Sequence, residues 1–233
     1  MTTLRTLSLI IILACLSFSL AGFTLHPRVK SGLNISQHYG IDYGYDEYEV
    51  EKGIRWGFTG GISFDFPVSE AVTVSQEFLF TTKGSSQVIG IADQPIEMDV
   101  TYKTDYLEFP TLLLLHHYRR NNFTVFYQTG FSFSYLINSH YEIDGTVETG
   151  TEDYPLDIDK RMKNIDQFDF GIILGGGIGF SISKRSFILD YRTNFGIPFI
   201  EFPTTEDVLP ETGISSRVRL RNLSYSLSLS LLL

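Results

Sequence analysis

The last fifteen residues, RLRNLSYSLSLSLLL, constrain the fold of this chain more than any other segment. From Leu223 onward, a large apolar residue occupies nearly every second position and a serine stands between. Successive side chains of a strand point to opposite faces, so this period of two predicts a strand with one apolar and one polar face. In water such a terminal strand would leave an apolar edge uncovered, whereas a transmembrane barrel places that face in lipid and pairs the last strand with the first.

The composition narrows the class of protein. The chain has 233 residues, a formal net charge of -9 and a mean hydropathy of only +0.04, which argues against a bundle of membrane helices. The acidic balance also argues against nucleic acid as a partner, because phosphates are bound by basic patches. Aromatic residues make up 14% of the chain, with 19 Phe and 13 Tyr, and rings of this kind suit lipid and its interface.

The N-terminus has the pattern of a secretory signal. Arg5 precedes the apolar run LSLIIILACLSFSL, and small residues before Ala21 suit cleavage there. We therefore expect a cleaved signal peptide over residues 1–21 and a single barrel domain over residues 22–233. A signal anchor and a lipoprotein cut before Cys15 are the alternatives. Because Cys15 is the only cysteine, cleavage after Ala21 would leave no disulfide, thiolate metal ligand or cysteine nucleophile.

Beyond residue 28, runs of ten to nineteen residues with alternating polarity recur along the chain. In one of them, Trp56, Phe58 and Ile62 alternate with polar residues and glycines. In another, Pro110 removes a backbone donor, so a bulge or register adjustment is expected near it. The eight runs are RVKSGLNISQHY, IRWGFTGGISFDF, AVTVSQEFLFTT, VTYKTDYLEFPTLLLLHHY, FTVFYQTGFSFSYLI, FDFGIILGGGIGFSIS, SFILDYRTNFGI and the C-terminal stretch.

The connections between these runs alternate in length. Three are short, formed by PVSE, RRNN and the residues around KR, and four are long, at about residues 40–53, 84–100, 138–164 and 198–218. Outer-membrane barrels have short periplasmic turns and longer extracellular loops, which matches this alternation. The sequence therefore predicts an all-β fold: an eight-stranded antiparallel up-and-down transmembrane β-barrel with short periplasmic turns and long extracellular loops.

The polar faces of the runs would line the interior of this barrel. An eight-stranded barrel is just wide enough for side chains to fill it, and buried charges are tolerated when they are paired or hydrated. Both signs of charge occur on these faces, so a structural polar network that plugs the lumen is favoured over an ion path. The residues predicted to form it are Arg55, Asp65, Glu77, Glu108, Asp190 and Arg192.

Other motifs do not predict a catalytic, cofactor or metal site. The glycines of GIILGGGIGF lie within a period-two run, whereas a nucleotide loop needs a strand, the glycines and then a helix. His116 and His117 are adjacent, so they would point to opposite faces of a strand. The acidic stretch at 138–164 matches no calcium loop and is expected to be solvated, although a binding or adhesive surface there stays open.

Three segments resemble the PorT-like outer-membrane β-barrel proteins. They are RVKSGLNIS in the first run, YLEFP at residues 106–110 and GIILGGGIGF in the sixth run. Phe109 stands where an aliphatic residue is commoner in that family, and Leu233 ends the chain where many barrels have an aromatic residue. The resemblance implies an eight-stranded barrel in the outer membrane, and the namesake is linked to protein secretion and to the exposure of secreted proteins at the cell surface.

Together these observations predict a non-enzymatic integral outer-membrane protein that needs no cofactor. It would act as a structural, binding or secretion-associated component. The partners expected are outer-membrane lipids, the barrel-insertion machinery, and secretion-system or cell-surface proteins. A narrow channel, a lipid A-modifying barrel enzyme and a soluble lipid-binding barrel are the alternatives.

Overall fold

The computed structural model describes residues 25–40, 48–91, 96–120, 122–148, 153–162, 166–197, 200–202 and 218–233. The predicted signal peptide lies outside these residues. In the described part of the chain, no helix is both long and apolar enough to cross a membrane. The strands are β1 (His26–Gly40), β2 (Tyr48–Lys52), β3 (Arg55–Pro67), β4 (Val72–Ile91), β5 (Ile96–Arg120), β6 (Phe123–Glu148), β7 (Asp153–Arg161), β8 (Phe168–Ile182), β9 (Arg185–Gly196), β10 (Ile200–Phe202) and β11 (Val218–Leu232).

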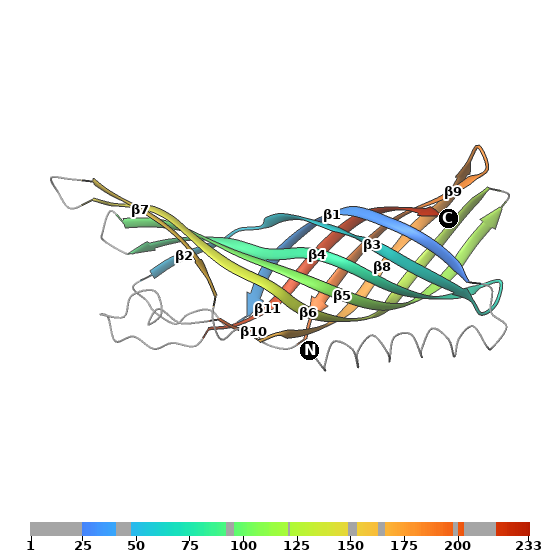
Figure 1. The fold of residues 1–233 in the computed structure, drawn as a ribbon, viewed down its shortest axis with the longest axis horizontal. Coiled ribbons are helices and arrows are strands. Elements are labelled where there is room, and N and C mark those ends of the chain that lie inside the picture. The colour runs from blue at the N-terminus through green and yellow to red at the C-terminus, as the bar shows by residue number, and fades with distance from the viewer. Residues whose placement is uncertain are drawn as a thin grey trace.

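Eight of these strands close into a barrel, in the order β1-β3-β4-β5-β6-β8-β9-β11, and β11 pairs with β1 (Figure 1). Every pairing is antiparallel, and the closing seam runs from Arg28 opposite Leu232 to Gly40 opposite Leu220. Closure leaves no barrel strand with an unpaired edge across lipid. The predicted eight-stranded antiparallel barrel is therefore confirmed.

The short connections gather at one end of the barrel, at the right of Figure 1, which we call the short-turn end. The β8–β9 hairpin turns through Ser183 (φ 49°) and Lys184 (φ 70°), and two successive left-handed residues match the twist of the flanking strands. The Leu233 amide donates to the Pro27 carbonyl oxygen at 3.0 Å, so the first and last described strands meet at this end.

At the opposite end, which we call the long-strand end, the structure corrects the predicted loops. Residues 84–100 and 138–164 are largely strand, because β4, β5 and β6 continue well past the ends of β3 and β8. β2 continues along β4, and β7 continues along β6, so these strands project beyond the barrel at the left of Figure 1. Polar and apolar residues alternate at 96–100 and 141–144, but residues 84–87 are glycine and polar residues without an apolar face, which made the first segment resemble a loop.

The irregularity expected near Pro110 is displaced. The β5–β6 register shifts between Asp105 and Tyr106 and again between His116 and Tyr118, whereas Pro110 itself pairs with Ser132. On the β4 side of β5, the ladder lacks only the pairs that would join Glu77 and Phe78 to β5. The β4–β5 register is the same before and after this gap. The missing amide donor therefore interrupts the ladder without shifting it.

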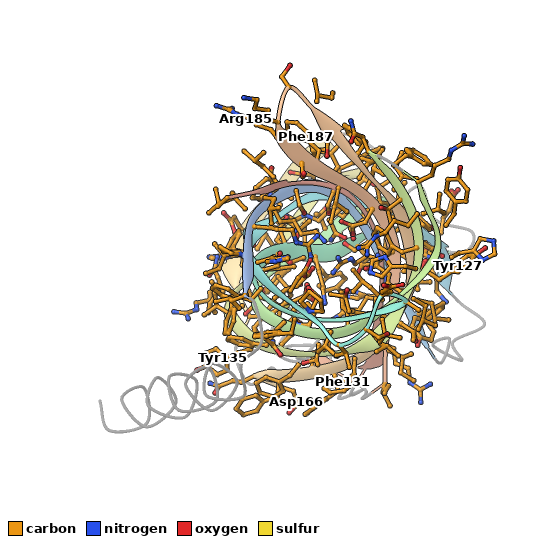
Figure 2. All side chains as sticks on the ribbon, turned by 90° about the vertical axis from the view of Figure 1, so that its right-hand side faces the viewer. Tyr127, Phe131, Tyr135, Asp166, Arg185 and Phe187 are labelled. Atoms are coloured by element: carbon orange, nitrogen blue, oxygen red, sulfur yellow. The ribbon has the colours of Figure 1, made fainter. Side chains whose placement is uncertain are left out.

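The two faces of the barrel wall have opposite chemistry. Phe58, Phe131 and Leu227 face outward and are 45%, 58% and 52% exposed, as a lipid-facing surface requires. Figure 2, which looks along the barrel from the short-turn end, shows Tyr127 and Phe131 on the outside of the ring. A row of outward rings crosses five neighbouring strands with centroids 5.1–6.1 Å apart, formed by Phe64, Phe78, Phe109, Phe133 and Phe170.

We expect the energetic cost of an outward charge to depend on its depth in the membrane. Phe131→Arg should lower the free energy of unfolding by about 2–4 kcal/mol, and Phe123→Arg, at the turn end of the same strand, by about 0–1 kcal/mol. Urea unfolding of the two variants in lipid bilayers measures the difference. Equal losses would contradict a lipid-facing position for Phe131.

Candidate functional site: the charged interior

The interior of the barrel is built from the inward positions of every strand, and its centre is a cluster of four charged residues. Lys30 of β1, Glu77 of β4, and Asp190 and Arg192 of β9 are all buried. The Arg192 guanidinium donates to Glu77 through Nη1 at 2.7 Å and through Nη2 at 3.1 Å, and its Nη2 also donates to Asp190 at 2.8 Å. Lys30 Nζ lies 3.3 Å from Glu77 and 2.9 Å from Asp190. We call these four residues the central cluster.

The central cluster joins opposite walls of the barrel. In the ring of eight strands, β4 and β9 lie four places apart in either direction, so the Arg192–Glu77 pair crosses the lumen along a diameter. Two positive and two negative groups neutralise one another there. The two parallel N–H bonds from Arg192 to Glu77 are of the bidentate kind, which fixes geometry as well as charge.

A second cluster lies toward the long-strand end. Lys83 Nζ is 2.5 Å from Glu108 Oε1 and 3.8 Å from Asp169 Oδ2, and it stands 5.1 Å from the centroid of the Tyr106 ring. Glu108 also accepts hydrogen bonds from the hydroxyls of Thr81 and Ser134 and from the amide of Asn194. A carboxylate with so many donors is satisfied without water, as a buried charge requires.

A third, smaller pair lies toward the short-turn end. Arg28 Nη2 donates to Asp65 Oδ1 at 2.6 Å and to Ser75 Oγ at 3.2 Å, and Arg28 is only 4% exposed. Three levels of paired charges therefore follow one another along the barrel axis.

Little space is left between the central and second clusters. The cavity there, which both Arg192 and Glu108 line, has a volume of about 20 Å³. A cavity needs roughly 10–15 Å³ to hold one water molecule, so this space admits about one water and forms no open channel.

Five of the six residues predicted for the interior network lie in these clusters. The sixth, Arg55, lies at the margin of the network. Asp65, Glu77, Glu108, Asp190 and Arg192 form the ion pairs described above. Arg55, at the long-strand end of β3, is half-buried, and its guanidinium donates to the carbonyl oxygen of Lys83.

Sequence reasoning missed Lys83 and Asp169. Lys83 continues the inward parity of Ser75, Glu77 and Thr81, but the third predicted run ended one residue before it. Asp169 shares its parity with the inward glycines of β8. Asp169 lies inside the sixth predicted run, where parity alone would have found it, whereas finding Lys83 required the third run to be extended by one residue.

The glycines of β8 make room for neighbouring side chains in the barrel interior. A Cβ at Gly171 would lie 1.9 Å from Asn194 Oδ1, so the missing side chain lets Asn194 donate to Ser132 at 2.9 Å. A Cβ at Gly177 would lie 2.6 Å from the ring of Phe126. Residues on both sides of these glycines are strand, without the helix that a nucleotide loop needs.

Three of the histidines lie in different surroundings. His116 Nε2 lies 2.9 Å from Thr73 Oγ1 in the interior, whereas the ring of His117 contacts the outward Tyr127. His38 Nδ1 lies 2.7 Å from Ser85 Oγ, and both residues are buried inside the barrel. Among the described residues, no three His, Cys, Asp or Glu side chains gather as a metal site would require.

A closed antiparallel barrel with an apolar exterior and an ion-paired interior defines a class: transmembrane β-barrel proteins. The chain belongs to the outer membrane protein beta-barrel domain family, which matches residues 23–198, and it is therefore an outer-membrane barrel. No curated protein sequence matches it significantly.

Several solved structures are similar to the chain. The attachment invasion locus protein Ail of Yersinia pestis, solved with the heparin analogue sucrose octasulfate, is 11% identical with a TM-score of 0.36, covering 90% of this chain and 99% of Ail. OprG of Pseudomonas aeruginosa is 8% identical with a TM-score of 0.48, covering 91% and 97%. The outer membrane protease OmpT of Escherichia coli is 8% identical with a TM-score of 0.36, covering 91% and 98%.

Removal of one partner from the central cluster should destabilise the protein strongly. Arg192→Met leaves Glu77 and Asp190 buried beside a single Lys30, which we expect to lower the free energy of unfolding by about 3–5 kcal/mol. As the control, Lys103→Met breaks a half-exposed pair with Glu142 and should cost less than about 1 kcal/mol. Denaturant unfolding in detergent micelles compares the two, and similar losses would contradict the buried network.

Proposed function

We propose that this protein is a non-conducting, non-enzymatic outer-membrane barrel that acts as a binding or assembly component at the cell surface. The observation that carries the proposal is the Arg192–Glu77 pair across the lumen, next to a cavity of only about 20 Å³. A barrel whose centre is filled by paired side chains acts through its two ends and its outer wall.

The chemistry inside the barrel supports the non-enzymatic part of the proposal. The Ser85–His38 hydrogen bond resembles part of a nucleophile–base arrangement. However, Ser85 and His38 are 2% and 3% exposed and lie on the lumen side, whereas lipid A would reach the barrel from its outer wall. We therefore assign this pair to the structural network.

The projecting strands support a role in binding. Asp99 of β5 lies directly opposite Asp144 of β6, and both are exposed, while Glu142 lies opposite Asp159 of β7. Like charges directly across a sheet are destabilising, so stability alone does not favour this arrangement. Because long loops of outer-membrane barrels are extracellular, we place this acidic face outside the cell and the short turns in the periplasm.

Conductance measurements in planar lipid bilayers test whether the central cluster closes the lumen. We expect purified protein in planar lipid bilayers to give no single-channel steps, because the central cluster closes the lumen. A fourfold variant, Lys30→Ser, Glu77→Ser, Asp190→Ser and Arg192→Ser, removes two charges of each sign and should produce steps if it folds. Reproducible steps from the unmodified protein would favour the channel instead.

The PorT-like resemblance extends the proposal to a secretion-associated role. Affinity purification from cross-linked, detergent-solubilised outer membranes should then recover subunits of a secretion system. Asp99→Asn with Asp144→Asn should reduce that recovery, whereas Glu70→Gln, in the exposed β3–β4 turn at the other end, should not. Recovery of the barrel-insertion machinery alone, by all variants equally, would contradict the secretion-associated role.

A further inference from the structure

The short-turn end of the barrel contains a second hollow that is much larger than the central cavity. Its volume is about 230 Å³, and it is lined by inward residues of β1, β3, β4, β5, β6, β8, β9 and β11. We call it the vestibule. The Arg28–Asp65 pair lies in its wall, and the central cluster one level deeper closes the lumen beyond it.

The inner wall of the vestibule is apolar. Leu114 and Phe126 line it and belong to a buried cluster with Leu112 and Ile173, and Ile188 packs against that cluster. Gly179 also lines the vestibule, and a Cβ there would meet nothing closer than 3.6 Å, the distance to Thr124 Cβ. The space over Gly179 is therefore open, bounded by hydrocarbon rather than by charges.

The mouth of the vestibule, by contrast, supplies hydrogen-bond donors and positive charge. Arg119 and Asn122 line the vestibule and are exposed. Arg28 is 4% exposed and uses Nη2 for Asp65 and Ser75, but its buried Nε–H has no hydrogen-bond partner among the described residues. The buried Nε lies out of reach of the open space of the vestibule, so a ligand oxygen there would contact the exposed Arg119 guanidinium. Among the described lining residues the sole carboxylate, Asp65, is already paired.

We propose that the vestibule binds a small organic carboxylate that carries one compact apolar group, of about the size of benzoate. The carboxylate would be held by the Arg119 guanidinium and the Asn122 amide at the mouth of the vestibule, and the apolar group would lie over Gly179 against Leu114 and Phe126. The size fits, because an apolar cavity of about 150 Å³ holds benzene, whereas drug-sized ligands need about 300–1,000 Å³. This site is separate from the acidic face and does not require conduction.

Benzoate, benzyl alcohol and benzylamine serve as probes, each titrated against the full protein in lipid nanodiscs by equilibrium dialysis, with empty nanodiscs subtracting partition into lipid. We expect saturable binding of benzoate and binding at least about tenfold weaker for the neutral and cationic probes, because a charge-assisted hydrogen bond is lost. Equal binding of the three probes, or none above empty nanodiscs, would overturn the proposal.

Two variants locate the site. Gly179→Leu fills the apolar part of the vestibule, and Arg119→Gln removes the exposed guanidinium without touching the Arg28–Asp65 pair; each should weaken benzoate binding at least about tenfold. Arg120→Gln changes the next residue, which is exposed and does not line the vestibule, and should leave binding unchanged. If Gly179→Leu fails to fold, Arg119→Gln decides, and unchanged benzoate affinity in that variant would contradict the site.

Discussion

The bidentate pair between Arg192 and Glu77 is the interaction on which the rest of this barrel depends. It spans the lumen between opposite strands, and Lys30 and Asp190 complete its charge balance. Removing these ions from water is costly, and only close pairing with full hydrogen bonding offsets that cost. The charges of the interior pair with one another inside the lumen. The lipid-facing side of the barrel is therefore apolar, from the row of rings between Phe64 and Phe170 to Leu227 on β11.

The filled centre divides the molecule into two ends with different chemistry. The short-turn end holds a hollow with an apolar inner wall and guanidinium groups around it. The long-strand end continues as a sheet whose outward residues Asp99 and Asp144 are acidic. In the proposals made above, the two ends would therefore bind ligands or partners of opposite charge.

Periodicity predicted the strands because lipid favours it: the outward residues of a spanning strand are mostly apolar, and the next residue along the strand faces the lumen. Glu77, Asp190 and Arg192 could be placed inside for that reason. Their partners could not be predicted, because pairing depends on how far each strand is staggered when the ring closes. Lys83 and the β6–β7 hairpin were missed because the apolar face is interrupted there, by Thr82 and Gly84 beside Lys83 and by the acidic residues of 138–164.

The seam between β1 and β11 joins residues about two hundred positions apart, from Arg28 with Leu232 to Gly40 with Leu220. No local segment can form this contact early, and contacts of such long sequence separation make folding slow. Until Leu223–Leu232 has been synthesised and aligned, β1 retains an unpaired edge. The polypeptide thus needs protection from aggregation until β11 is in place, and loss of β11 residues would leave the edge of β1 unpaired.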